Sequence, residues 1–224
     1  MEKVQPNHFN RSGAFYPIVV NYLHQLIGMK ELSIRAYFGD EPIDAKLKRL
    51  LGESQKTGSE EEYKKLQASV KKLCGPLQLR SEQHDTHIEI ETELIAQDTA
   101  ENFSYLSSYM LISAGQLLVV AFELIKESDH YEASPICEFL RHCRNGAAHG
   151  GKFNLRAHEP SRKAEWGKFI ISSDLNESPL FRRPNGTGML GIGDPIRLLW
   201  DIEQAHPNIG PCERVYGYLL EKEP

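Results

Sequence analysis

The apolar segment YMLISAGQLLVVAFELI, residues 109–125, constrains the fold more than any other part of the sequence. Its second half is apolar on most sides, as expected of the central helix of a bundle. The segment is short for a membrane span, follows the polar stretch ENFSYLSS and contains Glu123, so we interpret it as a buried core helix. The spacing predicts one long helix over 99–127, around which the rest of the chain packs.

Three more helices are predicted in the first third of the chain. Residues 13–38 carry apolar side chains at helical spacing. The segments 42–52 and 59–75 are shorter helices, each of which ends at a glycine. Residues 76–98 are ambiguous, because THIEIETEL alternates like a strand and also fits the beginning of the next helix.

The last third of the chain combines two helices with an extended segment. Ser134 is the predicted cap and Pro135 the first residue of one helix, which ends at Gly150–Gly151. The stretches EWGKFIIS and PLFRRPNGTGMLG are predicted to be short strands or extended segments with turns. A last helix has Asp194 as its predicted cap, and Pro207 stops it.

These elements predict a mainly α fold. The chain has 224 residues, of which 40% are hydrophobic, and this is enough for a buried core. We expect a single domain over 1–224, made of a helical bundle over 1–151 and a C-terminal extension over 152–224 packed on it. The extension contributes a small β-hairpin-like segment and the last helix, and Trp166 and Trp200 are its predicted anchors in the core.

Charge is distributed unevenly along the chain, whose net charge is −5. Residues 81–132 contain eleven acidic residues and one lysine, whereas residues 141–183 contain nine lysines or arginines and four acidic residues. The overall charge argues against a protein that coats nucleic acid along its whole surface, but not against one with a single basic cleft. An ordinary fluctuation of surface charge explains the pattern equally well.

The cysteine and N-terminal patterns favour a cytoplasmic protein. None of the four cysteines forms a C-x-x-C pair, which argues against a zinc site, and their spacing indicates no disulfide framework. We predict neither a metal nor a cofactor. The N-terminal residues are polar and lack a signal-peptide pattern, so no association with a membrane is expected.

The predicted helix that begins at Pro135 has two contrasting faces. One stripe is polar, lies at the i, i+3, i+4, i+7 and i+8 positions, and consists of Arg141, Arg144, Asn145, Ala148 and His149. The opposite stripe is expected to face the core and consists of Ile136, Phe139, Leu140, Cys143 and Ala147. The small residues beside the polar side chains leave them approachable by a second helix or a ligand.

The polar stripe contains the residue types that metal-independent RNA cleavage uses. In that reaction the 2′-hydroxyl attacks the adjacent phosphorus and leaves a cyclic phosphate. A histidine can move protons near neutral pH, because its unperturbed pKa is about 6.5. An arginine can stabilise the charge on the phosphoryl oxygens, and an asparagine can orient either partner. DNA would not react, because it lacks the 2′-hydroxyl.

The stretch RNGAAH, residues 144–149, resembles the signature motif of the HEPN superfamily. That motif is an arginine with a polar residue directly after it and a histidine a few residues further on. The resemblance implies a small helical bundle in which the motif lies on a late helix that follows a long one. Members with the motif are commonly metal-independent endoribonucleases of defence and toxin–antitoxin systems, and they act as homodimers whose motif helices face each other across a cleft.

Carried over residue by residue, the resemblance implies three catalytic residues. Arg144 would stabilise the phosphate, His149 would transfer protons and Asn145 would assist them. RNA is the implied partner, together with a second copy bound through the motif helix and a possible antitoxin protein. The nearby basic residues are predicted RNA contacts, and they are Arg141, Lys152, Arg156, Arg182 and Arg183.

Two other functions fit the same residues. A non-catalytic HEPN module would bind nucleic acid or a protein without turnover. A purely structural helical protein would use the polar stripe as a subunit contact, or as a solvated helix face with an interhelical hydrogen bond.

Overall fold

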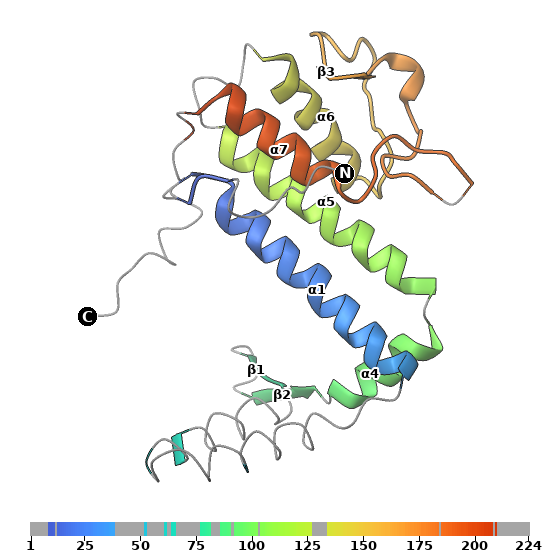
Figure 1. Ribbon diagram of the computed structural model, residues 1–224. Helices are drawn as coiled ribbons and strands as arrows, with labels where there is room; N and C mark the ends of the chain where they lie inside the picture. Colours follow the sequence, from blue (N-terminus) through green and yellow to red (C-terminus); the bar gives the residue numbers. More distant parts are fainter. Residues whose placement is uncertain are drawn as a thin grey trace. The chain divides into compact units, whose positions relative to one another are not determined.

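The computed structural model describes residues 9–11, 13–38, 52, 61, 64–65, 77–81, 86–90, 92–102, 104–126, 134–183, 185–207 and 209, and it is mainly helical, as predicted (Figure 1). The helices are α1 (Tyr16–Phe38), α4 (Thr92–Glu101), α5 (Ser104–Lys126), α6 (Pro135–Ala148) and α7 (Asp194–Ala205). The strands are β1 (Leu77–Ser81), β2 (Thr86–Ile90), β3 (Glu165–Trp166) and β4 (Phe169–Ile170), and Ser173–Leu175 forms a short 3-10 helix.

The chain forms two compact units. One consists of residues 1–27 and 107–224, and the other of residues 28–106. The prediction of a single domain over 1–224 stays a prediction. The helices predicted over 42–52 and 59–75 lie outside the described residues, apart from positions 52, 61, 64 and 65.

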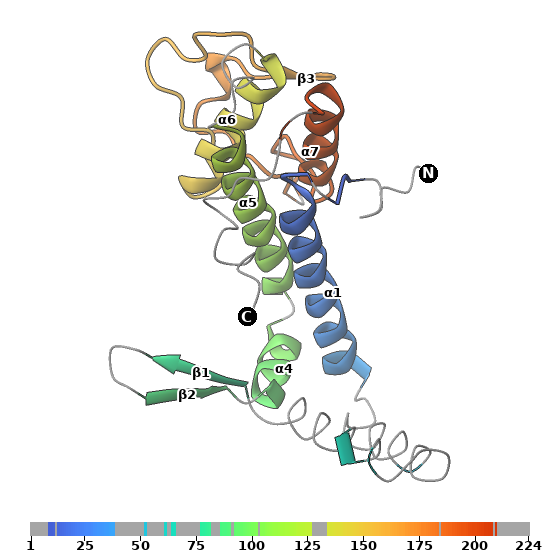
Figure 2. The ribbon, with the colours of Figure 1, turned by 90° about the vertical axis from the view of Figure 1, so that its left-hand side faces the viewer.

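The unit of residues 28–106 contains an antiparallel hairpin (Figure 2). Strands β1 and β2 pair from Leu77 opposite Ile90 to Ser81 opposite Thr86. The ambiguous segment is thus a strand up to Ile90 and a helix from Thr92. The alternation in THIEI predicts the second strand, whereas LQLRS alone was not recognisable as the first.

The long helix predicted over 99–127 is present as α5, but it begins at Ser104, and residues 99–101 belong to the separate helix α4. The reason is Asn102, at the end of α4. Its backbone N–H and its side-chain amide both donate to the carbonyl oxygen of Asp98, at 2.9 and 3.1 Å. The amide also donates to the Asp98 carboxylate at 3.1 Å. Local side-chain bonds of this kind compete with the continuation of a helix.

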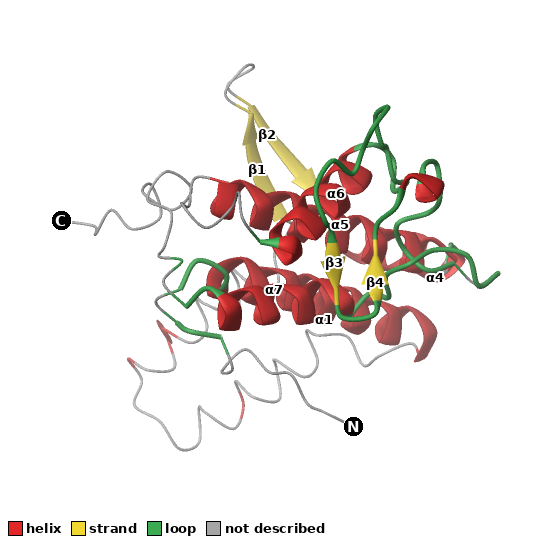
Figure 3. Cartoon of the chain, turned by 90° about the horizontal axis from the view of Figure 1, so that it is seen from above, coloured by secondary structure: helices red, strands yellow, loops and turns green. Residues whose placement is uncertain are grey.

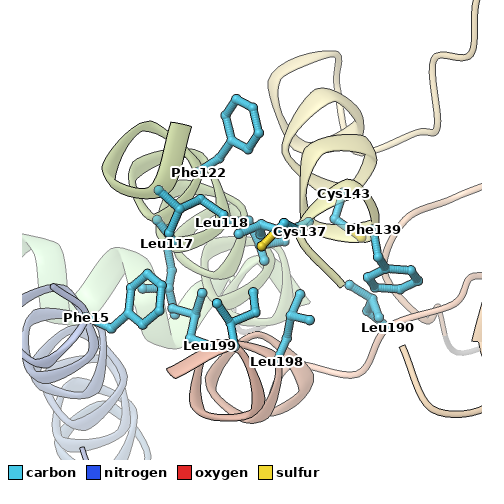
Figure 4. Packing of buried hydrophobic residues seen from close by; sticks show 14 of the residues in the cluster. Phe15, Leu117, Leu118, Phe122, Cys137, Phe139, Cys143, Leu190, Leu198 and Leu199 are labelled. Carbon is cyan, nitrogen blue, oxygen red and sulfur yellow. The ribbon is translucent and has the colours of Figure 1, made fainter. Parts of the chain in front are cut away.

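The core of the other unit lies between α5, α6, α7 and the beginning of α1. Phe15, Leu118, Phe139 and Leu199 belong to one buried cluster that these segments form, and each is at most 1% exposed (Figure 4). Burial of each such side chain stabilises the fold by about 1.5–3 kcal/mol. The second half of α5 is therefore a core helix on its α1, α6 and α7 sides.

Helix α5 is also the one helix among the described residues that is long and apolar enough to cross a membrane. Its window Leu106–Lys126 has a mean hydropathy of 1.7, and 44% of that window is buried inside the protein. Length and composition alone do not separate a core helix from a membrane span. The prediction of a cytoplasmic protein without a membrane contact stays a prediction.

Two polar contacts hold the N-terminal segment to the region around α7. The hydroxyl of Tyr22 donates to the carbonyl oxygen of Ile192 at 3.0 Å, and burial raises the pKa of Tyr22 to about 12. The backbone N–H of Asn10 donates to Glu203 Oε2 at 3.2 Å. Burial raises the pKa of Glu203 despite this bond. These contacts join residues far apart in the sequence.

The segment after α6 folds against α6 and α7 through aromatic side chains. The β3–β4 hairpin, seen from above in Figure 3, carries Trp166 and Phe169, whose ring centroids lie 5.9 and 6.5 Å from that of Phe139 in α6. Trp166 Nε1 donates to Asp201 of α7 at 2.8 Å. The predicted hairpin is thus present, and Trp166 is one of its anchors. Helix α7 begins at Asp194 itself and is capped by Gly193, so the predicted cap at Asp194 is wrong by one residue, and the helix ends at Ala205, before Pro207.

Residues 180–190 form a loop that returns on itself. The backbone N–H of Arg182 donates to Leu190 at 2.7 Å, and that of Leu190 donates to Leu180 at 2.8 Å. Gly188 makes this approach possible, because its φ is +98° and a Cβ there would collide with the carbonyl group of Phe181. Gly186 also has a positive φ, +81°, but a Cβ there would meet nothing within 4 Å.

The two glycines allow a matched test of this loop. Gly186→Ala should cost only the strain of a left-handed alanine, about 1–2 kcal/mol of unfolding free energy. Gly188→Ala should lower the free energy of unfolding by clearly more, because the loop must also open to relieve the collision with the carbonyl group of Phe181. Urea denaturation of both variants measures the difference, and equal losses would contradict the close approach at Gly188.

Candidate nucleic-acid site

Helix α6 buries the apolar face that its sequence predicts. Phe139, Leu140 and Cys143 have no exposed surface, and burial raises the pKa of the Cys143 thiol well above its usual value. Ile136 and Ala147 are half-buried and pack against the same core. The buried surface is wider than predicted, because it also includes His142, which is 1% exposed.

The end of α6 is a glycine reversal that places His149 outside the helix. The backbone N–H of Gly151 donates to the carbonyl oxygen of Gly146 at 2.9 Å, as in a Schellman motif. Gly150 and Gly151 both have φ of +77°, a conformation that a side chain disfavours. His149 is the cap residue, and its backbone N–H donates to Asn145 at 3.0 Å. Its imidazole is exposed and makes no hydrogen bond within the described part of the chain.

The reversal sends the chain back across α6 at Gly146. A Cβ at Gly146 would lie 3.1 Å from the carbonyl oxygen of Lys152, so glycine allows the returning chain to lie this close. The carbonyl oxygen of Gly151 then accepts the backbone N–H of Leu180 at 2.8 Å. The loop of residues 180–190 is in this way attached to the end of the motif helix.

Arg144 is held by side chains from two helices. Its Nη2 donates to Glu123 Oε1 of α5 at 2.9 Å, and its Nη1 donates to Asn145 Oδ1 at 3.2 Å. Its guanidinium lies over the ring of Phe122, 5.6 Å from the centroid. Its Nε is buried and has no acceptor in the described part of the chain. Arg144 is thus partly desolvated and oriented by α5.

Sequence reasoning named Glu123 but gave it no role in the site. The signal was its position as an acidic residue within an apolar helix, where a carboxylate usually has a partner. Glu123 also forms a longer ion pair with Lys126, at 3.7 Å. The sequence could not show that Arg144, 21 positions away, is its closer partner.

A cavity of about 610 Å³ opens beside the end of α6. Helix α5 supplies one wall, which includes Ile112, Gln116 and Val119. Ala148 and Gly150, the two neighbours of His149, line another part, and the 180–190 loop contributes Phe181 and Arg183. Arg144, Asn145 and His149 are not among the lining residues, but both chain neighbours of His149 line the cavity, as does Arg183, one of the predicted RNA contacts.

The structure separates the predicted RNA contacts from one another. Arg183 lines the cavity, and Arg182 and Arg156 are exposed outside it. Lys152 is half-exposed and lies 3.5 Å from Glu177. Arg141 does not join Arg144 at a common surface, because it is engaged elsewhere. The contacts of these five residues with RNA stay predictions.

Arg141 belongs to a largely buried charge cluster. It donates to both oxygens of Glu138, at 2.8 and 3.0 Å, and to Glu159 at 3.2 Å. Hydrogen bonding to Glu138 outweighs burial and raises the pKa of Arg141. Burial opposes ionisation of Glu159, but the Arg156 N–H and Arg141 together hold the pKa of that carboxyl below its usual value.

His142 completes this cluster as a neutral acceptor. Its Nε2 lies 2.9 Å from Arg141 Nη2, which can only donate, and 3.4 Å from Glu138 Oε1. Nδ1 is buried without a partner among the described residues. Burial, and then the charge of Arg141, lower the pKa of His142 even though Glu138 and Glu159 oppose this shift.

Comparisons of this chain with protein-family models, with curated proteins and with solved structures found no match. The resemblance to the HEPN superfamily therefore rests on RNGAAH and its helical context alone. Among the described residues, no group of three or more His, Cys, Asp or Glu side chains is placed to hold a metal ion. The prediction of metal-independent chemistry stays untested.

Acidification should unfold the protein partly through His142. Because its pKa is lowered in the folded state, the unfolded chain binds a proton more readily as pH falls below about 6.5. The parent should therefore lose stability between pH 7.5 and 5.5. His142→Gln, which keeps an acceptor for Arg141 but does not titrate, should lose less over this range.

Urea denaturation at both pH values measures this difference. His24→Gln, at an exposed position on α1, is the control and should behave like the parent. This pH range lies above the one in which the Glu159 carboxyl titrates, because its pKa is below its usual value. An equally steep loss in His142→Gln would show that His142 does not carry the pH dependence.

Proposed function

We propose that this protein is a metal-independent endoribonuclease of the HEPN type. The observation that carries the proposal is that His149 is exposed at the end of the helix that carries Arg144, where its chain neighbours Ala148 and Gly150 line a cavity. An imidazole without a hydrogen-bond partner among the described residues is available to a ligand. Such a placement suits a group that exchanges protons with a substrate.

Arg144 fits the role of a phosphate-stabilising cation. Its contacts with Glu123 and Asn145 reduce the motion of the side chain before a ligand arrives. Preorganised donors stabilise developing charge better than mobile ones, because little reorganisation remains for the reaction step.

The proposed reaction needs only groups of the RNA and this chain. The 2′-oxygen forms a bond to the adjacent phosphorus as the bond from phosphorus to the 5′-oxygen breaks. The proton of the 2′-hydroxyl is released and the 5′-oxygen gains one, with His149 taking part in these transfers. Arg144 stabilises the negative charge on the phosphoryl oxygens, and Asn145 helps to orient it. The products are a 2′,3′-cyclic phosphate and a 5′-hydroxyl.

A non-catalytic nucleic-acid-binding or protein-interaction module is the second candidate. The ion pair between Arg144 and Glu123 favours it, because the carboxylate partly neutralises the charge that the phosphate would use. Turnover distinguishes the two candidates, because only the nuclease cleaves the RNA that it binds.

The HEPN resemblance extends the proposal to the assembly and the biological context. It implies a homodimer through the motif helix and a role in defence or in a toxin–antitoxin system, where an antitoxin protein could be a partner. Sedimentation of the full chain tests the homodimer directly.

Replacement of either motif residue should abolish RNA cleavage. His149→Ala and Arg144→Ala should each reduce the rate by about 10²–10⁴-fold, the usual contribution of a positioned acid or base. The measurement is digestion of single-stranded RNA by the full chain in EDTA, with analysis of the product ends. His24→Ala, which changes an exposed histidine of α1, should leave the rate unchanged. Equal cleavage by the parent and both motif variants would rule out this active site.

Glu123 should act as a positioning residue through its bond to Arg144. Glu123→Gln retains an oxygen acceptor, so its kcat should stay near that of the parent. Glu123→Ala leaves Arg144 without this partner, and a lost charge-assisted hydrogen bond predicts a decrease of kcat by about tenfold or more. The ratio of kcat between the two variants is the readout, and a ratio near one would mean that Glu123 does not position Arg144.

A further inference from the structure

The cavity beside His149 has two kinds of surface. Its walls are mainly apolar, with Ile112 and Val119 from α5 and Phe181 from the 180–190 loop. The end of α6 lines another part of the cavity with the small residues Ala148 and Gly150. Apolar walls of this kind favour a ligand with flat or apolar faces that gain from leaving water.

The polar side chains that line the same cavity are Ser108, Gln116 and Arg183. The amide of Gln116 is exposed and makes no hydrogen bond within the described part of the chain, so it can both donate and accept. The Arg183 guanidinium is exposed and has no carboxylate partner among the described residues. Arg141 and Arg144, in contrast, are paired with acidic side chains. The uncompensated charge at the cavity is therefore positive, which favours an anionic ligand.

The size of the cavity selects among anionic ligands. A volume of about 610 Å³ lies within the usual range for small-molecule sites and exceeds the needs of a bare phosphate. An anion with a flat ring system, hydrogen-bonding edges and an apolar face satisfies every part of the lining. A nucleotide has these properties, and proteins that read single-stranded RNA bind unstacked bases in this way, on apolar or aromatic surfaces with polar groups at the base edges.

We infer that the cavity is a base subsite for the nucleotide next to the scissile phosphate of single-stranded RNA. The inference rests on the proposed nuclease function, since the lining residues Ala148 and Gly150 flank His149. The base lies against Ile112 and Val119, Gln116 bonds its edge, and Arg183 neutralises a neighbouring phosphate. A purine is preferred to a pyrimidine, because its larger ring system removes more apolar wall from water.

This subsite depends on the segment after α6 as well as on the motif helix. Phe181 and Arg183 reach the cavity because Leu180 is bonded to Gly151 and because Gly188 allows the loop to close. The sequence preference of the nuclease would therefore be encoded outside RNGAAH.

Filling the cavity is the decisive test. Ile112 is 56% exposed, so Ile112→Trp can be accommodated while the larger ring occupies the cavity. Ile170→Trp is the matched control, because Ile170 is 59% exposed and lies on β4, away from the cavity lining. Both are made in the full chain with His149→Ala, so that RNA is bound but not cut. The probes are fluorescent single-stranded hexanucleotides, one of uridine only and one with purines.

The expected result is a selective loss of binding. Ile112→Trp should weaken binding of the purine hexamer at least tenfold, and Ile170→Trp should leave it unchanged. Gln116→Ala should reduce the preference for purine over uridine, because only the base edge is affected. Arg183→Ala should weaken both hexamers and make binding less dependent on salt, whereas Arg162→Ala, at an exposed arginine outside the lining, should not.

Cleavage assays with the intact His149 separate this inference from the proposed function. If Ile112→Trp cuts and binds RNA like the parent, the base subsite is overturned while the nuclease stands. If the parent does not cut RNA but purine binding still depends on Ile112, the nuclease is overturned and the subsite stands as a binding site. If Ile112→Trp instead changes the sedimentation of the protein and not its RNA binding, the cavity is a contact with a second copy and the inference fails.

Discussion

The reversal of the chain at Gly150–Gly151 is the constraint on which the site depends. It ends α6 one residue before His149, and it returns the chain across the helix at Gly146. Both consequences follow from glycine, because two successive residues have φ of +77°, which side chains disfavour, and because the chain crosses close to Gly146. This reversal of the chain exposes the imidazole of His149 and also attaches the 180–190 loop to the same end of α6.

The two arginines of the polar stripe illustrate how packing assigns different roles to similar residues. Arg141 and Arg144 lie three positions apart on α6. Arg141 is bound by Glu138 and Glu159 in a cluster that also buries His142, so its charge is used within the fold. Arg144 has one carboxylate partner, keeps 30% of its side chain exposed and retains an unpaired Nε–H. Of the two arginines, only Arg144 is held in one orientation and still has a single carboxylate partner among the described residues.

Local sequence signals predicted the elements that have their own caps and turns. Pro135 and Gly150–Gly151 bound α6, and Asp194 and Pro207 bracket α7, because these residues act on their immediate neighbours. The break between α4 and α5 was not predicted, because it depends on the bonds that Asn102 makes to Asp98. The burial of His142 and the partner of Arg144 were not predictable, since each depends on residues brought close by tertiary packing.

The sequence by itself determined a mainly helical chain, the helix that carries RNGAAH, and the glycines that end it, because periodicity, capping and glycine conformation are local properties. Tertiary structure decided the partners of the polar residues and which residues line the cavity. Glu123 meets Arg144, and Arg183 comes close to the end of α6, across many residues of sequence. Spacing along a chain places residues on a helix face, but the surroundings of that face come from segments whose positions depend on the packing of the whole core.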